Sequence, residues 1–414
     1  GVGVAPALLT ITPAATWDFG AVANGSVNDK SFTITNTGGL TATGIAGGGL
    51  AAPVTFKGGG FPGTGGTCSG GTLAAGATCT FVVTYAPLST AAMADTIEVA
   101  YHNGVEAKQV TRDVIGSSSA PAVLAISETG TFSFGAKANG SVTDKTFTIT
   151  NSGAFTASAL APTAFSAPYS FKGNLYPGSG GTCGLTLPGG QTCTVVVTFS
   201  PTVTGTHNST LEMAYNDGVQ NLTVQRGLTG VSSAPAVLTI SGSNPVDFGT
   251  IAVGASADQT FTLQNTGGYD ASSVTEVGLA PPFAFKGGTF PGTGGNCATP
   301  IAAAASCSIV VTYTPTGTGL QSDAIEMSYN NGVSVVLSTR NVQGTGVAPA
   351  NIAISGANPL DFGTVATGGA KDMSVTLTNT GGLTATSLSG GGISAPFTFK
   401  GGGFPGTGGT CTGG

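Results

Sequence analysis

Short runs in which apolar and polar residues alternate recur along the chain, separated by residues that favour turns. Residues 29–36 (DKSFTITN) place Phe32 and Ile34 on one face, and residues 79–85 (CTFVVTY) have the same alternation. A period of two in segments rich in Thr and Val predicts β-strands with one buried face, and no helical period extends over a useful length. Further strands are expected nearby at residues 8–12, 54–57, 96–101 and 105–114.

Asn-Gly or Asp-Gly dipeptides join pairs of these runs. Because both residues tolerate a positive φ, such dipeptides are the strongest short signal for a hairpin turn. They occur at Asn103-Gly104, Asp217-Gly218 and Asn331-Gly332. About seven short, turn-separated strands per stretch of about 114 residues predict an all-β fold of tandem immunoglobulin-like antiparallel β-sandwich domains.

The same landmarks return about every 114 residues, which indicates tandem copies of one module. The dipeptide Phe-Gly, for example, occurs at 19–20, 134–135, 248–249 and 362–363. Each copy is long enough to bury its own core, so we expect separate domains rather than a continuous solenoid. The expected domains are residues 1–117, 118–231 and 232–346, with a partial fourth at 347–414.

The partial fourth copy closely matches the first. Residues 36–71 and 379–414 are identical at 29 of 36 positions, which suggests duplication of a three-domain block. Because the counterparts of residues 80–114 are missing from the fourth copy, we expect the sequence to be a window on a longer polypeptide. A chain that repeats a single module favours a structural or adhesive array over an enzyme.

Charge is scarce, at 7% of residues against about 25% in an average soluble domain. The 12 Lys and Arg residues form no cluster, which argues against recognition of nucleic acid through its phosphates. No apolar run reaches the roughly 18–20 residues of a membrane span. The sequence has neither the C-x-x-C-H motif of a bound haem nor an Asp-rich calcium loop, so no cofactor and no metal is expected.

Six of the seven cysteines form close pairs, one in each complete repeat. The pairs are Cys68 with Cys79, Cys183 with Cys193, and Cys297 with Cys307. Regular pairing predicts disulfides and an oxidising, extracellular or cell-surface location, and each bond would contribute about 2.8 kcal/mol on the chain-entropy model. Zinc is the alternative, but its sites use closer spacing and further ligands, which the two histidines do not supply regularly.

An aromatic residue followed by Pro and Gly precedes the first cysteine of each pair. The residues are Phe61 and Pro62, Tyr176 and Pro177, Phe290 and Pro291, and Phe404 and Pro405. These loops could contact a neighbouring domain or a target surface. Alternatively, each ring could plug its own domain while the adjacent cysteine holds the loop in place.

Three kinds of charged residue recur at fixed places in the repeats. They are Lys57, Lys172, Lys286 and Lys400; Glu98, Glu212 and Glu326; and Arg112, Arg226 and Arg340. The lysine could form an isopeptide bond with an asparagine beside the glutamate as a buried acid. Alternatively, its stem packs on aromatic rings while its amine meets loop carbonyls or that glutamate. The arginines are expected to pair with an acid on a neighbouring strand.

No catalytic constellation recurs in the repeats. His102 and His207 have no counterparts in the other copies, which argues against Ser/His/Asp and Cys/His catalysis. The aspartates that precede Phe-Gly, Asp18, Asp247 and Asp361, are replaced by Ser133 in the second copy, which weakens any catalytic or metal role. The chain is therefore not expected to be an enzyme.

The string Trp17-Asp18-Phe19-Gly20, followed by a Gly-centred turn and FTITNTGG, resembles bacterial Ig-like domains related to the abnormal-spindle/Hydin (ASH) group. The second half, from Cys68 through a Gly-rich loop to CTFVVTYAP, is similar to the repeats of large secreted choice-of-anchor D proteins. This resemblance extends over essentially the whole chain and implies the fold, but the family is functionally diverse. Eukaryotic relatives are intracellular, whereas paired cysteines and scarce charge resemble the secreted bacterial branch.

These features predict the structural repeat region of a large secreted bacterial surface or filament protein, forming a semi-rigid rod. Low surface charge removes repulsion between neighbours, so self-association or contact with other surface proteins is expected. One alternative is an adhesin stalk that binds glycans or another cell through the Gly-rich loops. Two others are a spacer beside an enzyme elsewhere in the full-length chain and an intracellular scaffold.

Overall fold

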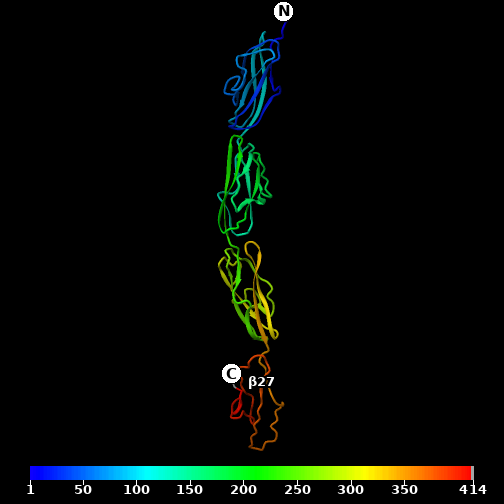
Figure 1. Ribbon diagram of the computed structural model, residues 1–414, viewed down its shortest axis with the longest axis vertical. Helices are drawn as coiled ribbons and strands as arrows, with labels where there is room; N and C mark the ends of the chain where they lie inside the picture. The colour runs from blue at the N-terminus through cyan, green and yellow to red at the C-terminus, as the bar shows by residue number, and fades with distance from the viewer. Residues whose placement is uncertain (412–414) are drawn as a thin grey trace. The chain divides into compact units, whose positions relative to one another are not determined.

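The chain folds as a series of β-sandwiches, as a computed structural model that describes residues 1–411 shows (Figure 1). Within these residues the only helical element is a single 3₁₀ turn, η1 (Lys172–Asn174). Three complete sandwiches, called modules one, two and three, are followed by a partial segment at residues 348–411. The predicted fold class of tandem Ig-like β-sandwiches with one disulfide per complete domain is therefore confirmed.

Module one contains two sheets that enclose one core. The four-stranded sheet has the order β1-β3-β7-β5, and the five-stranded sheet has the order β2-β9-β8-β4-β6. The strands are β1 (Leu9–Thr12), β2 (Trp17–Ala23), β3 (Asn28–Asn36), β4 (Ala42–Gly48), β5 (Val54–Phe56), β6 (Thr72–Leu73), β7 (Thr78–Tyr85), β8 (Ala92–His102) and β9 (Ala107–Ser119).

Modules two and three repeat this arrangement with two four-stranded sheets each. In module two the strand orders are β10-β12-β15-β14 and β11-β17-β16-β13. In module three they are β18-β20-β23-β22 and β19-β25-β24-β21. Module two comprises β10 (Leu124–Ile126), β11 (Phe132–Ala138), β12 (Thr143–Asn151), β13 (Ser158–Pro162), β14 (Tyr169–Phe171), β15 (Thr192–Phe199), β16 (Gly205–Asn216) and β17 (Asn221–Ser233). Module three comprises β18 (Leu238–Ile240), β19 (Val246–Ala252), β20 (Ala257–Asn265), β21 (Ser272–Glu276), β22 (Phe283–Phe285), β23 (Ser306–Tyr313), β24 (Gly319–Asn330) and β25 (Val335–Val347).

One strand pair departs from the expected antiparallel pattern. After β1 the chain leaves the first sheet and joins the second as β2, which pairs in parallel with the last strand of the module, β9. In module three, β19 and β25 pair in parallel in the same way. Each complete module thus has eight or nine strands rather than about seven. The crossover contributes an additional strand, β2 or its equivalent, to the second sheet.

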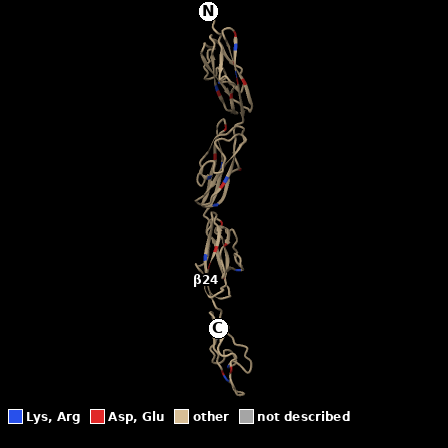
Figure 2. Ribbon diagram, turned by 90° about the vertical axis from the view of Figure 1, so that its right-hand side faces the viewer, with Lys and Arg blue, Asp and Glu red and all other residues tan. Residues whose placement is uncertain are grey.

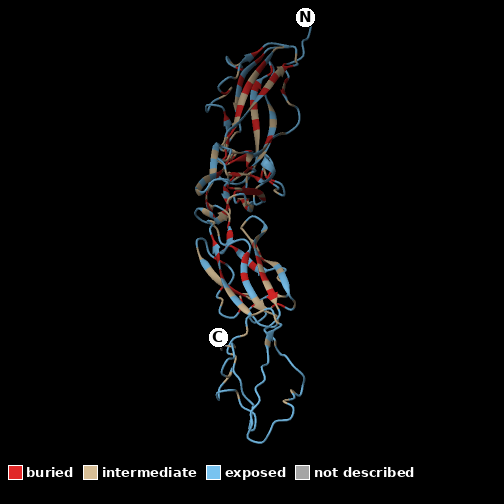
Figure 3. Ribbon diagram, turned by 60° about the horizontal axis from the view of Figure 1, so that its bottom comes forward, coloured by how far each residue is buried: buried red, intermediate tan, exposed pale blue. Residues whose placement is uncertain are grey.

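The three cores are separate, and aromatic and branched side chains fill each of them. Figure 3 marks the buried residues in red along the strands. In module one, Phe32 and Phe81 stack with their ring centroids 5.3 Å apart, and both are fully buried together with Tyr85. Modules two and three bury the equivalent aromatic residues Phe147, Phe199, Phe261 and Tyr313. Each module therefore encloses its own core, as expected for independent domains rather than a solenoid.

The partial segment forms little regular structure. Its two strands, β26 (Ile352–Ile354) and β27 (Leu377–Asn379), pair with each other, and most of its residues are exposed (Figure 3). Residues that correspond to core positions of module one stay open to solvent, such as Phe397, which is 51% exposed where Val54 is fully buried.

Charged residues are thinly scattered along the strands and loops (Figure 2). Their main grouping is one Lys–Asp ion pair that recurs in each module. In residues 1–411 there is no helix with the length and apolar character that a membrane span requires.

Candidate functional site

The most distinctive feature outside the core is a glycine-rich loop that follows the short edge strand of the first sheet. In module one this loop covers residues 57–68 and leads from β5 towards β7, and we call it the aromatic loop. The equivalent loops are residues 172–183, 286–297 and 400–411. They contain the recurrent lysine, the aromatic-Pro-Gly string and the first cysteine of each pair.

The aromatic loop hydrogen-bonds along the edge of β7 in place of a strand. The backbone N–H of Val82 donates to Pro62 O at 2.8 Å, and Lys57 N donates to Val82 O at 2.9 Å. Further along, Cys68 N donates to Thr80 O at 3.1 Å, while Thr80 N donates to the hydroxyl of Thr67 at 2.9 Å. The loop therefore satisfies the outward backbone groups that a free edge would expose.

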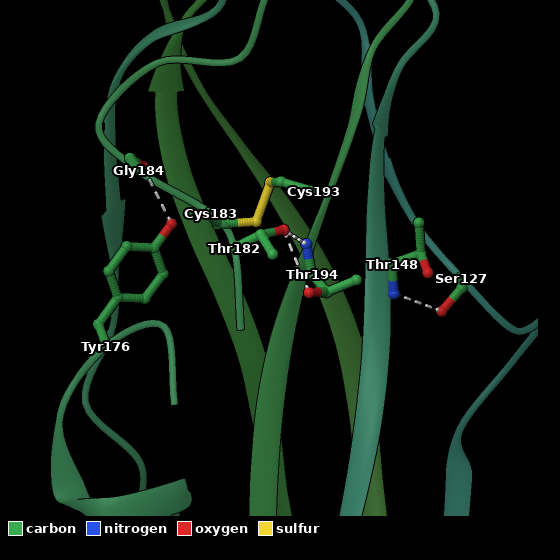
Figure 4. Close-up of a disulfide and its surroundings, with 8 residues drawn as sticks. All are labelled: Ser127, Thr148, Tyr176, Thr182, Cys183, Gly184, Cys193 and Thr194. Carbon is green, nitrogen blue, oxygen red and sulfur yellow. Dashed lines mark hydrogen bonds between the residues drawn. A yellow bond between two sulfur atoms is a disulfide. The ribbon is translucent and has the colours of Figure 1, made fainter. Parts of the chain in front are cut away.

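Modules two and three repeat these contacts closely. Val196 N donates to Pro177 O and Val310 N donates to Pro291 O, each at 2.9 Å. The side-chain contact recurs as well, from Thr194 N to the Thr182 hydroxyl at 3.0 Å (Figure 4) and from Ser308 N to the amide oxygen of Asn296 at 2.7 Å. The loop therefore makes the same hydrogen bonds to the edge of β7, β15 or β23 in each of the three modules.

The ring of each aromatic loop is turned towards its own module. Phe61 lies edge-on to Phe56 with centroids 5.4 Å apart and also contacts Phe81, and it packs against the core of module one. Tyr176, Phe290 and Phe404 take the same edge-on position against Phe171, Phe285 and Phe399. Burial raises the pKa of Tyr176 to about 12. This placement supports the plug interpretation rather than an exposed sticky ring.

The cysteine pairs form the expected disulfides, which join the end of each aromatic loop to β7, β15 or β23. The bonds are Cys68–Cys79, Cys183–Cys193 (Figure 4) and Cys297–Cys307, with Cα atoms 4.8–4.9 Å apart. Cys411, at the end of the fourth loop, is a free thiol. Each bond fixes the loop at the point where β7, β15 or β23 begins.

The recurrent lysine pairs with an aspartate on the central strand rather than with the expected glutamate. Lys57 Nζ lies 2.7 Å from Asp29 Oδ2, and the hydroxyl of Thr84 donates to Asp29 Oδ1 at 2.5 Å. The ion pairs of the other copies are Lys172–Asp144 at 3.0 Å, Lys286–Asp258 at 2.8 Å and Lys400–Asp372 at 2.5 Å. The lysine thus ties the start of the aromatic loop across β7 to β3.

These contacts hold the aspartates in the charged form. The Lys57 hydrogen bond, followed by that of Thr84, lowers the pKa of Asp29, and the Thr198 and Lys172 bonds lower the pKa of Asp144. An ionised carboxylate is a poor acceptor for amide formation with an amine, because no leaving group is activated. The local chemistry therefore favours an ion pair and not a covalent link.

The proposed isopeptide arrangement is absent from the described modules. The recurrent glutamates lie on β8, β16 and β24 in the opposite sheet, away from the lysines. Glu212, for example, accepts hydrogen bonds from the Thr163 hydroxyl at 2.8 Å and from the amide of Gln225. The isopeptide alternative and the lysine–glutamate contact both fail because the lysine precedes the loop on one sheet while the glutamate belongs to the other.

The recurrent arginines were also assigned the wrong partner. Arg226 donates to the backbone oxygens of Ile126 and Gly130, at 2.5 and 2.8 Å. Arg112 and Arg340 bind the corresponding carbonyls of Ile11 and Ala14, and of Ile240 and Ser243. These carbonyls lie near the end of the first strand of each module or just after it, where the chain crosses to the other sheet. The planar guanidinium bridges the two carbonyls and holds this crossing in place.

The Phe-Gly landmark is a structural bulge. Asp18 Oδ1 accepts the N–H of Gly20 at 2.7 Å, and the register of β2 against β9 shifts between Asp18 and Ala21. Gly20 has φ of 73°, which favours glycine. Ser133 accepts the N–H of Gly135 in the same way, at 3.1 Å, which explains why serine replaces aspartate there.

A buried asparagine, which is not among the predicted site residues, makes hydrogen bonds across each module. Asn151 is fully buried; its oxygen accepts from Val123 N and Gly153 N, and its amide donates to Phe155 O and Leu187 O. Asn36 and Asn265 make the same set of contacts. Its recurrence within the repeated string N-x-G was the available signal. That signal is weak because the asparagine is the last residue of a strand, where Asn and Gly also indicate a turn.

A tyrosine on the other sheet assists at the same end of the module. The hydroxyl of Tyr101 accepts the N–H of Leu9 at 3.3 Å, and Tyr215 and Tyr329 do the same for Leu124 and Leu238. The first strand is thus held by both sheets. In residues 1–411 no cluster of three or more His, Cys, Asp or Glu side chains could bind a metal ion.

Comparison with protein families identifies one family model. The HYDIN/CFA65/VesB-like Ig-like domain model matches residues 126–226 and 239–345, which together make up half of the chain. Comparison with curated proteins finds no match.

Several solved structures are similar in fold at low identity. The I-band fragment I67–I69 of titin is 11% identical over 83% of this chain and 99% of its own, with a TM-score of 0.31. The Vibrio cholerae VesB protease is 18% identical over 26% of this chain and 31% of its own, with a TM-score of 0.22. The ASH/PapD-like domain of human CEP192 is 17% identical over 27% and 84%, with a TM-score of 0.20. At these scores no functional inference follows from them.

Proposed function

Since the chain belongs to the HYDIN/CFA65/VesB-like family of Ig-like domains, we propose that it is the repeat region of a secreted bacterial surface or filament protein of the choice-of-anchor D type. Its role is structural, and each module is a unit that bears tension. In this proposal the domains are residues 1–117, 118–231, 232–346 and the partial 347–414. No catalytic step is assigned to it.

The observation that carries the proposal is the parallel pairing of an early strand with the last strand, as seen in modules one and three. β2 and β9 are near opposite ends of the module in sequence but run side by side, from Trp17 with Val114 to Ala23 with Ser119, with one register shift between Asp18 and Ala21. When the two ends are pulled apart, parallel strands slide past each other, so their hydrogen bonds are loaded together rather than one at a time. This geometry resists extension.

The disulfides support export of the chain, and the scarcity of charge supports self-association. Disulfides persist in oxidising compartments, so an exported chain is favoured over a cytosolic one. A net charge of −6 on 414 residues gives little repulsion between copies, which supports self-association. Glycan recognition, the adhesin alternative, has less support because the rings of the aromatic loops are turned towards their own cores.

Single-molecule force spectroscopy on the full chain tests the proposal. We expect three unfolding peaks separated by contour-length steps of roughly 350 Å, since each extended residue adds about 3.3–3.6 Å. In module three, Val253 N donates to Val347 O at 2.8 Å at the end of the parallel pair. Val253→Pro removes this bond, and Val253→Ala, the matched control, keeps it.

The proline variant should lower one of the three peaks clearly below its value in the alanine variant. Hydrogen exchange of module three in both variants, without load, separates mechanical weakening from a failure to fold. If the modules extend without resolved peaks, or if the two variants unfold at the same force, the load-bearing role is wrong.

A further inference from the structure

In module one, groups other than a strand cover β1 and the first half of β7 in the first sheet. At one edge, Leu9 N donates to the hydroxyl of Tyr101, and Ile11 O accepts from the guanidinium of Arg112. Both side chains come from the opposite sheet. At the other edge β5 pairs only with residues 83–85 of β7, and the aromatic loop covers the first half of β7. The two edges are protected by different means.

The edge under the aromatic loop is the one most suited to pair with another strand. Residues 78–85 (TCTFVVTY), 192–199 (TCTVVVTF) and 306–313 (SCSIVVTY) contain no charged residue and no proline. Segments with high β-propensity and no charge are the ones that stack edge to edge when exposed. No lysine, proline or bulge within these strands prevents such pairing, so the aromatic loop alone does so.

Besides its hydrogen bonds to β7 and the packing of its ring, the loop is attached at both ends. Six of the twelve residues at positions 57–68 are glycine, so the backbone gains much conformational freedom when it is released. The loop is held at its start by the Lys57–Asp29 ion pair, which is half exposed, and at its end by the Cys68–Cys79 bond. The disulfide is the covalent attachment, and it lies next to the half of β7 that does not pair with β5.

We propose that the aromatic loop is a removable cover, and that reduction of its disulfide exposes a strand edge that pairs with the same edge of a second copy of the chain. Residues 78–82 of two copies would align antiparallel about a two-fold axis, and residues 192–196 and 306–310 would do the same. The occupant is a second copy because the same uncharged strand lies behind the cover in all three modules. This inference is independent of the load-bearing role.

The chemical step is a thiol–disulfide exchange with a dithiol. One thiolate of the dithiol attacks a sulfur of the Cys68–Cys79 bond, and the second displaces the protein thiol to form the oxidised dithiol. Two electrons pass to the protein, and two protons convert Cys68 and Cys79 to thiols. Before reduction the aromatic loop covers the strand edge. After reduction only the noncovalent contacts of the loop, its hydrogen bonds, ring packing and ion pair, oppose pairing with another strand.

The test uses the full chain with and without dithiothreitol, alkylated with iodoacetamide after reduction so that no mixed disulfide forms. Sedimentation velocity reports association, and hydrogen exchange reports the amides of Thr80 and Val82 and of their equivalents. The blocking variant carries Thr78→Lys, Thr192→Lys and Ser306→Lys, at exposed positions on the covered strands. The matched control carries Thr111→Lys, Thr223→Lys and Thr339→Lys, at exposed positions on the opposite sheet.

We expect reduction to convert the wild-type chain and the control variant to dimers or larger species, with exchange of the covered amides at least tenfold faster before association. The blocking variant should show the faster exchange but keep the mass of the oxidised chain. Unchanged exchange after reduction would overturn the proposal, because the cover would not depend on the disulfide. Equal association of the two lysine variants, or none in the reduced wild type, would overturn it too.

Discussion

Lys286 Nζ lies 2.8 Å from Asp258 Oδ2, and the hydroxyl of Thr312 donates to the other carboxylate oxygen at 2.6 Å. The lysine comes from the start of the aromatic loop, the threonine from β23 and the aspartate from β20. This contact therefore fastens the loop to the central strands of the sheet. The same three residue types meet in modules one and two, where Thr84 and Thr198 supply the hydroxyl.

Acidification should weaken this contact. The Lys286 hydrogen bond, followed by that of Thr312, lowers the pKa of Asp258 in the folded chain. Because the pKa of Asp258 is lower in the folded chain than the unfolded value of about 3.9, its ionisation stabilises the fold. This stability is fully present above the unfolded pKa and is lost as the pH falls through the folded pKa. Because the pair is partly exposed, we expect Asp258→Asn to cost a few tenths to about 1 kcal/mol at neutral pH. Hydrogen exchange of module three in the full chain measures this.

The pH dependence of the variant provides the internal check. Below the folded pKa of Asp258 the wild type has lost the ion pair, so the difference between wild type and Asp258→Asn should shrink. Glu276→Gln changes an exposed carboxylate in the same module and serves as the control. A difference that stays constant from neutral pH to below the unfolded pKa would mean that the ion pair does not contribute.

Replacing the buried asparagine should be far more damaging than breaking the ion pair. Asn151→Ala leaves two backbone N–H groups and two carbonyls of module two without their partner. Each buried group left unsatisfied costs roughly 1–3 kcal/mol, so we expect a loss of at least about 3 kcal/mol in the stability of module two. Asn208→Ala, at an exposed position on β16, is the matched control and should change stability by less than about 0.5 kcal/mol.

The outcome for Asn151 should appear as faster exchange in module two, with the other modules as internal references. A stability loss no larger than that of the Asn208 control would show that water or backbone rearrangement replaces the side chain. The hydrogen bonds of Asn151, which join the chain at the first strand to the turn after β12, would then not stabilise the module.

Strands with an unbroken alternation were predictable from the sequence, and strands with a bulge were not. Residues 29–36 and 79–85 lie within β3 and β7, because period two is the signature of one buried face. β2 and β4 were missed. Each contains a register shift at a residue of positive φ, Gly20 in β2 and Gly44 in β4, which interrupts the alternation. In β13 and β21 the bulge residues are Ala159 and Ser273, so even glycine does not mark the position.

At the aromatic loop the sequence identified the right residues but not all of their partners. The cysteine pairs were predictable because their spacing is local. The partner of Lys57 was not, since Asp29 lies on a strand whose position beside the loop follows only from the order β3-β7-β5. The same holds for Arg226, whose carbonyl partners are about a hundred residues earlier in the chain. Contacts of this kind depend on the fold as a whole.

Gly344 on β25 should not tolerate a side chain. A Cβ at this position would lie 2.4 Å from the ring of Tyr313, which is fully buried, so the ring or the strand must move. Overpacking of this kind costs about 1–3 kcal/mol, and we expect Gly344→Ala to destabilise module three by that amount. Gly317→Ala is the control, because an added Cβ meets nothing within 4 Å there. Equal stability of the two variants, measured by hydrogen exchange, would mean that the ring is free to shift.

The disulfides should be visible in the length that each module releases under load. The Cys183–Cys193 bond closes a loop with a sequence separation of 10, which cannot extend while the bond is intact. Replacing both cysteines by serine should lengthen one of the three contour-length steps by roughly 35 Å, from about 3.3–3.6 Å per released residue. Dithiothreitol should lengthen all three steps of the wild-type chain and only the other two of the variant. Steps that are unchanged by both treatments would show that these cysteines are not bonded in the native chain.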